Sequence, residues 1–166
     1  DPAYVGRAKE VQKAQKAIEA GEDPVKALPE LEAVLNAVHT KYADVRPENM
    51  GVGSTIFAVK PGDGSAREQA ASCQKVLGGW ANIANEYATK RYRSNLINWG
   101  MLPLLIDAGE LPFKVRKPVE EKASDVKAYV VKGTELKEVS LKMGELTDDE
   151  RSIILDGCLI NYNRVS

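Results

Sequence analysis

The chain is short of several residue types whose presence would point to particular functions. Among its 166 residues there are two cysteines and one histidine, and aromatic residues make up 6%. Lys and Arg number 23 against 24 Asp and Glu, a net charge of −1, which argues against a nucleic-acid-binding domain driven by net charge. No apolar run approaches the ~20 residues of a membrane span, and no leader segment is evident. We therefore expect a cytoplasmic protein without a membrane partner.

The few thiol and imidazole groups do not form a metal-binding pattern. Cys73 and Cys158 lie far apart in the sequence, and neither has the spacing of a metal site. Without secretory features, two buried thiols are a better expectation than a disulfide. His39 falls in a helical pattern and is expected at the surface or at a boundary.

One segment combines a strand, a glycine turn and a helix start. The β-branched and aromatic run 55–59 predicts a buried strand, and the turn Gly62-Asp63-Gly64-Ser65 follows it. Ser65 falls where a helix N-cap belongs, the helix is expected over 66–77, and the glycines at 78–79 end it.

This geometry suits an anion. Helix N-terminal N–H groups, a serine hydroxyl and the Arg67 guanidinium would meet at one point and could receive a carboxylate or phosphate. An equally good interpretation is a capped helix whose Arg67 pairs with a nearby acid. The pattern is neither a P-loop nor a complete dinucleotide fingerprint, because the third glycine is missing.

The turn resembles the Gly-x-Gly-Ser-Ser-Arg-Glu motif of the aconitase superfamily's swivelling C-terminal domain. The segment 95–104 (NLINWGMLPL) is similar to the family's N-L-x-x-x-G-x-L-P-L motif, and 149–162 is similar to its closing helix. The resemblance covers 51–109 well and 146–165 moderately. Residues 1–50 show no resemblance to the family.

The resemblance implies roles for the turn residues. Ser65 matches the catalytic base, which deprotonates the substrate carbon next to a carboxylate. Arg67 matches the arginine that grips a substrate carboxylate, and Gly64 and Ala66 belong to the same substrate-binding turn. Ala66 stands where aconitase has a second, substrate-binding serine, so one hydroxyl is missing.

Other positions also depart from the family pattern. Lys60-Pro61 replaces the Asn and aromatic residue that usually precede the turn, and Gln69 replaces the usual His. These departures leave the reaction type intact and put citrate as the substrate in doubt.

The resemblance further implies a [4Fe-4S] cluster held by three cysteines of other domains, with no metal or cofactor bound by this chain. The missing cluster-binding domains and a small-molecule carboxylate are thus the expected partners. The chain opens at Asp1 without a methionine, so we expect a domain cut from a larger enzyme; the alternative within the family is a separate small subunit, as in isopropylmalate isomerase.

The rest of the chain divides into regions of one expected domain, 1–166. Residues 1–50 predict two amphipathic helices, the first ended by Gly21 and the second with Pro29 in its first turn. The core, 51–113, adds a helix near 91–98 and a strand at 102–106, which together predict a parallel α/β layer.

Residues 114–166 predict paired strands around a turn at 132–134, and then a helix capped by Thr147. The basic segment Lys90-Arg91-Tyr92-Arg93 is too short for an RNA site, and its side chains are expected to face solvent or acids of a partner domain.

The predicted fold is a three-layer β/β/α swivelling domain with additional N-terminal helices. The predicted function is the C-terminal domain of a hydratase or dehydratase acting on a di- or tricarboxylic hydroxy acid, inactive on its own. The alternative from another functional class is a non-catalytic domain that binds a carboxylate or a partner protein.

Overall fold

The structure is a computed structural model that describes residues 2–107, 125–133 and 135–165. Its strands form a five-stranded sheet in the order β1-β2-β3-β5-β4. The predicted boundary between residues 113 and 114 lies outside the described residues. Within the described ranges, no helix has the length and apolar character needed to cross a bilayer.

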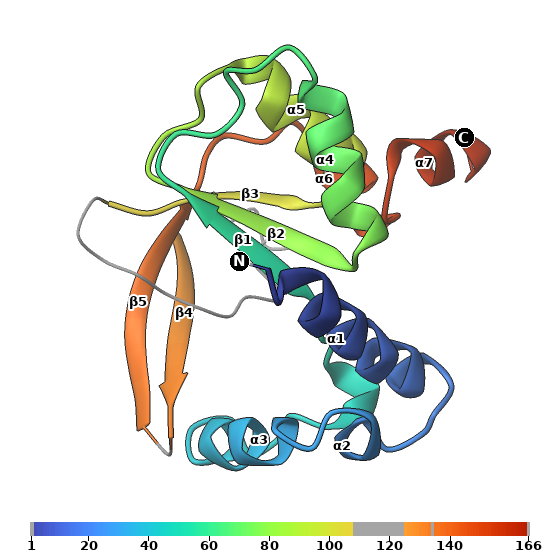
Figure 1. Cartoon of the computed structure of the whole chain (residues 1–166), viewed down its shortest axis with the longest axis vertical. Helices are drawn as coiled ribbons and strands as arrows, with labels where there is room; N and C mark the ends of the chain where they lie inside the picture. The colour runs from blue at the N-terminus through green and yellow to red at the C-terminus, as the bar shows by residue number, and fades with distance from the viewer. Residues whose placement is uncertain (1, 108–124, 134, 166) are drawn as a thin grey trace.

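The first half of the sheet is parallel, as predicted. β1 (Ser54–Ala58), β2 (Gly79–Ala84) and β3 (Leu102–Leu105) lie side by side in chain order. Their connections are α4 (Arg67–Val76) and α5 (Lys90–Asn98), which pack together at one end of the molecule (Figure 1). β1 is an edge strand, so its residues are half-buried and the prediction of a buried strand is wrong.

The second half of the sheet is an antiparallel hairpin. β4 (Asp125–Lys132) pairs with β5 (Glu135–Met143) along its whole length. β5 joins β3 only through Leu104↔Met143 and Leu105↔Lys142, and the hairpin then turns away from the parallel strands (Figure 1). The α/β class is confirmed, and the described strands all belong to this one bent sheet. Gly133, with φ 63°, lies in the hairpin turn, and the predicted turn residue Thr134 is outside the described residues.

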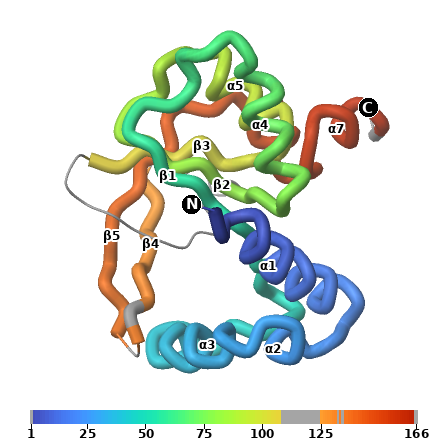
Figure 2. The backbone as a smooth tube through the Cα atoms, viewed as in Figure 1, coloured from blue at the N-terminus to red at the C-terminus, as the bar shows by residue number. Residues whose placement is uncertain are grey.

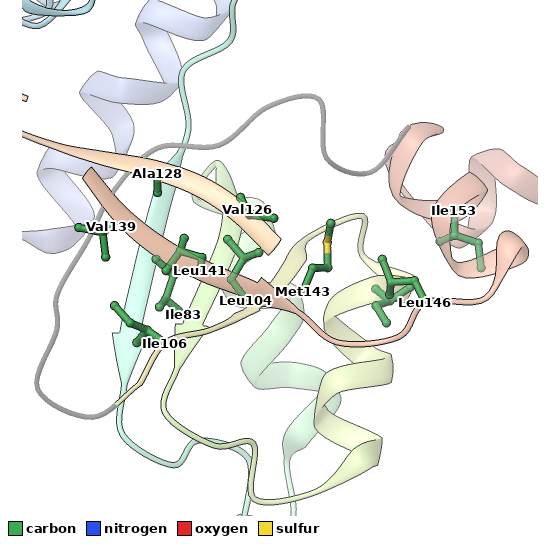
Figure 3. Close-up of a cluster of buried hydrophobic side chains, with 11 residues drawn as sticks. Ile83, Leu104, Ile106, Val126, Ala128, Val139, Leu141, Met143, Leu146 and Ile153 are labelled. Atoms are coloured by element: carbon green, nitrogen blue, oxygen red, sulfur yellow. The ribbon is translucent and has the colours of Figure 1, made fainter. Parts of the chain in front are cut away.

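The main core joins the two halves of the sheet to helices α5 and α6 (Asp148–Leu155). Alternate residues of β4 and β5 contribute to it, and Figure 3 shows most of its members gathered among the strands, with Leu146 and Ile153 on the side of α6. Its buried residues are Ile83, Ile97, Leu104, Ile106, Val126, Ala128, Val139, Leu141, Met143, Leu146 and Ile153.

The N-terminal region is helical, as expected. It contains α1 (Tyr4–Glu19), α2 (Pro24–Ala27) and α3 (Leu31–His39), followed by the short 3-10 turn η1 (Pro47–Asn49). A small core of its own forms around Ala14, Leu28 and Leu31. Pro29 precedes α3 instead of lying in its first turn, so that prediction is wrong; His39 is exposed, as predicted.

The C-terminal segment begins as predicted and then breaks. Thr147 caps α6 in a capping box, with Glu150 N–H donating to Thr147 Oγ1 at 3.2 Å. Gly157, with φ 87°, interrupts the helix, and α7 (Leu159–Val165) completes the described chain. The tube in Figure 2 shows α7 projecting at the periphery, close to the C-terminus.

Candidate functional site

The glycine turn lies at the carboxyl edge of the parallel strands. Parallel strands all end at the same edge, which is where open α/β sheets commonly place their ligand sites. The segment after β1 and the segment after β2 are bound to each other: Glu86 N–H donates to Val59 O (3.1 Å) and Ala88 N–H donates to Pro61 O (2.9 Å). In Figure 1 these two segments run together at the same end of β1 and β2. We call residues 62–67 the site loop.

The site loop begins at Gly62, where a residue with a side chain would not fit. Gly62 has φ 97°, and a Cβ built on it would lie 2.6 Å from Tyr92 Cδ1. Its carbonyl accepts a hydrogen bond from Thr89 Oγ1 at 3.0 Å. The start of the loop is therefore fixed by a backbone conformation that favours glycine and by contacts with the start of α5.

Ser65 is exposed and does not cap α4. The helix begins at Arg67, and Ala66 occupies the N-cap position with φ −87° and ψ 48° and no side-chain cap hydrogen bond. The predicted N-cap role of Ser65 is therefore wrong. Its hydroxyl makes no hydrogen bond with any described residue, and no side chain covers the first-turn N–H groups of the helix. Both remain available to a ligand.

Arg67 folds back on the loop that precedes it. Its Nε donates to Gly64 O at 2.7 Å and its Nη2 donates to Asp63 O at 3.3 Å. Among the described residues Arg67 pairs with no acid, and its hydrogen bonds go to backbone carbonyls, which the alternative of a simple Arg–acid pair did not predict. The guanidinium instead fixes the shape of the turn around Ser65.

The charged neighbours of the loop are mostly engaged elsewhere. Lys60 Nζ pairs with Glu86 Oε2 at 2.9 Å, and Glu68 Oε1 accepts from Trp99 Nε1 at 3.0 Å. Lys90 and Arg91 are exposed, as predicted.

The other half of the basic segment faces inward. Tyr92 is buried, and Arg93 donates to Glu145 O (2.6 Å) and pairs with Glu150 (3.5 Å) of the same chain. The expectation that these two side chains face solvent or a partner is therefore wrong.

A polar network that the sequence did not reveal lies beneath the loop. Asn82 is fully buried on β2, and its Nδ2 donates to Gln74 Oε1 at 2.8 Å. Gln74 Nε2 donates to the hydroxyl of Tyr92 at 2.9 Å. Burial raises the pKa of Tyr92, so the phenol stays protonated and keeps its own donor. The only sequence signal for this network was Asn82, a polar residue within the apolar segment 80–84.

The site loop lies within a segment that matches a known protein family. The family model described as the aconitase C-terminal domain matches residues 8–109, which include the site loop. The chain belongs to the aconitase C-terminal domain family. The predicted resemblance is thus confirmed, and with it a hydratase-type domain at the level of the family. The sequence motifs did not match residues 1–50 to the family, yet residues 8–50 belong to the matched segment; their helical pattern carried no motif to recognise.

Other comparisons add little to the assignment. The search of curated proteins found no match. Among solved structures, this aconitase-type domain is similar to the 3-isopropylmalate dehydratase (leuD) of Methanocaldococcus jannaschii, at 27% identity and a TM-score of 0.49. The alignment covers 78% of this chain and 75% of that chain.

The remaining motifs of the aconitase-type domain lie outside the site loop and build its frame. Gly100 (φ 67°) follows α5, and its Cα approaches the backbone of Gly157 so closely that no Cβ would fit. Asn161 Nδ2 donates to Asp156 O at 2.8 Å, closing the turn between α6 and α7. These glycine and asparagine positions thus hold helices α5, α6 and α7 together.

The described residues do not fit an iron–sulfur cluster. No three His, Cys, Asp or Glu side chains in the described ranges converge into a metal site. Cys73 is exposed and Cys158 half-buried, and both are free thiols. The expectation of two unpaired thiols is confirmed, and the expectation that both are buried is wrong.

Proposed function

We propose that this domain supplies the proton-transfer and carboxylate-binding loop of a hydro-lyase acting on a di- or tricarboxylic hydroxy acid. The observation that carries the proposal is the exposed, unengaged hydroxyl of Ser65 beside Arg67, on a loop at the carboxyl edge of the parallel strands. The family assignment places the loop in a domain type associated with hydration chemistry.

Ser65 is the proposed base that removes the proton next to a substrate carboxylate. A serine hydroxyl is a weak base, so its site must stabilise the alkoxide. The N-terminus of α4 has no side-chain cap, and its N–H groups together with Arg67 supply positive potential next to Ser65. Because the Ser65 hydroxyl has no hydrogen bond with a described residue to break, its side chain is free to turn toward a substrate.

Arg67 is the proposed carboxylate clamp, with one edge for the loop and another for the substrate. The guanidinium presents its five N–H donors in a planar fork. Its Nε and Nη2 donate to Gly64 O and Asp63 O, so that edge is occupied by the loop. The outer edge, formed by Nη1 and Nη2, is left for bidentate binding of a carboxylate. Substrate recognition and loop shape thus depend on the same side chain.

The pocket itself requires another domain or subunit. Gly64, Ser65 and Ala66 are all exposed. Two hollows, of about 250 and 450 Å³, lie along α1 and the turns after it, and neither is lined by a site-loop residue. We propose that the covering partner binds the [4Fe-4S] cluster and is either the rest of the same chain or a large subunit. The three regions 1–50, 51–113 and 114–166 would then act as one domain.

Ala66 is the proposed specificity position. A serine there would add a hydroxyl able to bind a substrate oxygen, and a methyl group removes that partner. With Lys60-Pro61 and Gln69 also departing from the family pattern, the substrate should differ from citrate near Ala66.

The test is turnover by the full-length protein, or by the chain with its large subunit, on a panel of di- and tricarboxylic hydroxy acids. Formation of the unsaturated acid from one non-citrate substrate is expected, and Ala66→Ser should not improve it. Saturable binding of a carboxylate without turnover would contradict the proposal and favour the non-catalytic binding domain. Efficient turnover of citrate by the wild type, with Ala66→Ser no better, would contradict the role of Ala66.

A further inference from the structure

A single hydroxyl group holds both the start of α5 and the start of the site loop. Thr89 is the N-cap of α5, and its Oγ1 accepts from Tyr92 N–H at 3.2 Å. The same Oγ1 donates to Gly62 O at 3.0 Å. A threonine hydroxyl has one donor, so the bond to Gly62 uses its whole donating capacity.

Tyr92, whose backbone N–H group donates to Thr89, reinforces this arrangement. Tyr92 is buried, and its ring occupies the space where a side chain at Gly62 would lie. Its hydroxyl accepts from Gln74 Nε2 at 2.9 Å, near the far end of α4. The start of α5 therefore contacts both the residue that opens the site loop and the helix that follows it.

We infer that Thr89 is a positioning residue, which sets the place of Ser65 by holding Gly62 O and which does not itself touch the substrate. The inference rests on the proposed function of Ser65. Thr89 is half-buried, and both of its hydrogen bonds are to backbone groups. Removing its donor should release the site loop while leaving the fold intact, and a small misplacement of a catalytic group can cost about 10²-fold in rate.

Thr89→Asp separates the two functions of the hydroxyl. An aspartate caps a helix as well as threonine does, because its carboxylate accepts the Tyr92 N–H bond. A carboxylate has no donor, so the bond to Gly62 O is lost. Thr89→Ser retains both bonds and is the rescue variant.

Thr147 provides a matched control. It caps α6 through the same type of bond, Glu150 N–H to Thr147 Oγ1 at 3.2 Å, and makes no hydrogen bond with a site-loop residue. Thr147→Asp should therefore leave turnover unchanged. If Thr89→Asp does not fold, Thr89→Val takes its place and is compared with Thr147→Val. Each valine variant lacks the hydroxyl and so removes its helix cap completely.

Two readouts are needed: kinetics of the assembled enzyme, and backbone ¹⁵N order parameters of Gly64, Ser65 and Ala66 in this chain. Thr89→Asp should lower kcat roughly 10- to 100-fold with KM within about threefold, because positioning acts on the transition state. The loop order parameters should fall from about 0.85 toward 0.6, while Thr89→Ser and Thr147→Asp stay at wild-type values.

The outcomes separate the inference from the proposed function. If Thr89→Asp, or Thr89→Val in its place, retains wild-type order parameters and kcat, the positioning role is wrong. If the order parameters fall in the Thr89 variant alone, and the wild-type enzyme turns over no hydroxy acid, Thr89 still positions the loop and the proposed function fails.

Discussion

Gly100 and Gly157 meet backbone to backbone, although 56 residues separate them in the sequence. A Cβ on Gly100 would lie 2.9 Å from Gly157 Cα and closer still to its carbonyl group. Each glycine belongs to a different motif of the family resemblance. Their contact explains why position 100 needs glycine: it lets the end of α5 pack against the turn between α6 and α7. At Gly157 glycine is favoured instead by the backbone conformation, with φ 87°.

Gly100→Ala should therefore destabilise the fold strongly. The new methyl group meets backbone atoms that cannot turn aside, and the residue has φ 67°, so we expect a loss of about 2–4 kcal/mol in the free energy of unfolding. Gly133→Ala is the control, since φ is 63° there and a Cβ meets nothing within 4 Å. Urea unfolding measures both. Equal losses in the two variants would show that strain alone, without the Gly157 contact, explains the effect.

A polar cluster ties the end of α3 to the β4–β5 hairpin and gives the fold an acid-sensitive contact. Lys41 Nζ pairs with Glu138 Oε2 at 3.2 Å and lies 4.3 Å from the ring centroid of Tyr129. Tyr129 donates to Glu138 Oε2 at 3.1 Å and accepts from the hydroxyl of Tyr42 at 3.0 Å. The hydrogen bond from Lys41, then that from Tyr129, lowers the pKa of Glu138 below its usual 4.5.

Because the pKa of Glu138 is lower in the folded protein than in the unfolded chain, its ionised carboxylate stabilises the fold at pH values above the pKa of the unfolded chain. This stabilisation is lost as the pH falls through the pKa of the folded protein. Glu138→Gln should therefore be less stable than the wild type near pH 7, and the difference should shrink below about pH 4. The effect is small because the pair is exposed. Glu135→Gln is the control, since the exposed side chain of Glu135 makes no hydrogen bond or ion pair with described residues. A difference that stays constant with pH would contradict the linkage.

Arg67→Lys should impair binding and turnover together in the assembled enzyme. Lysine cannot hold Gly64 O and Asp63 O while also forming a bidentate pair with a carboxylate. We expect KM to rise at least roughly tenfold and kcat to fall by a similar factor. Arg7→Lys, an exposed arginine on α1, is the control. An unchanged KM for Arg67→Lys would mean that the guanidinium shapes the loop without touching the substrate.

The sequence predicted elements whose local signals agree with the tertiary structure. The strand predicted at 55–59, the helices predicted at 66–77 and near 91–98, and the helix capped by Thr147 are all present, with bounds that differ by one or a few residues. The glycine turn lies between β1 and α4 as predicted, but Ser65 was expected to cap α4. Serine is the better N-cap, yet Ala66 takes that position because Thr89 and Arg67 hold the backbone of the loop.

Two other errors arose because contacts between elements far apart in the sequence are not visible in local patterns. Tyr92 was taken as part of an exposed basic segment, but it packs against Gly62 and bonds Gln74. The half-burial of β1 follows from its edge position, which only the strand order reveals.

The most direct test of the central claim is the kinetic comparison of wild type and Ser65→Ala in the assembled enzyme. Ser65 is exposed and makes no hydrogen bond with described residues, so its replacement should not change the unfolding temperature. A proton-transfer group contributes roughly 10²–10⁴-fold, so kcat should fall by that factor while KM stays within a few-fold. Ser140→Ala, on an exposed position of β5, should match the wild type. Near-normal kcat for Ser65→Ala would show that another group is the base.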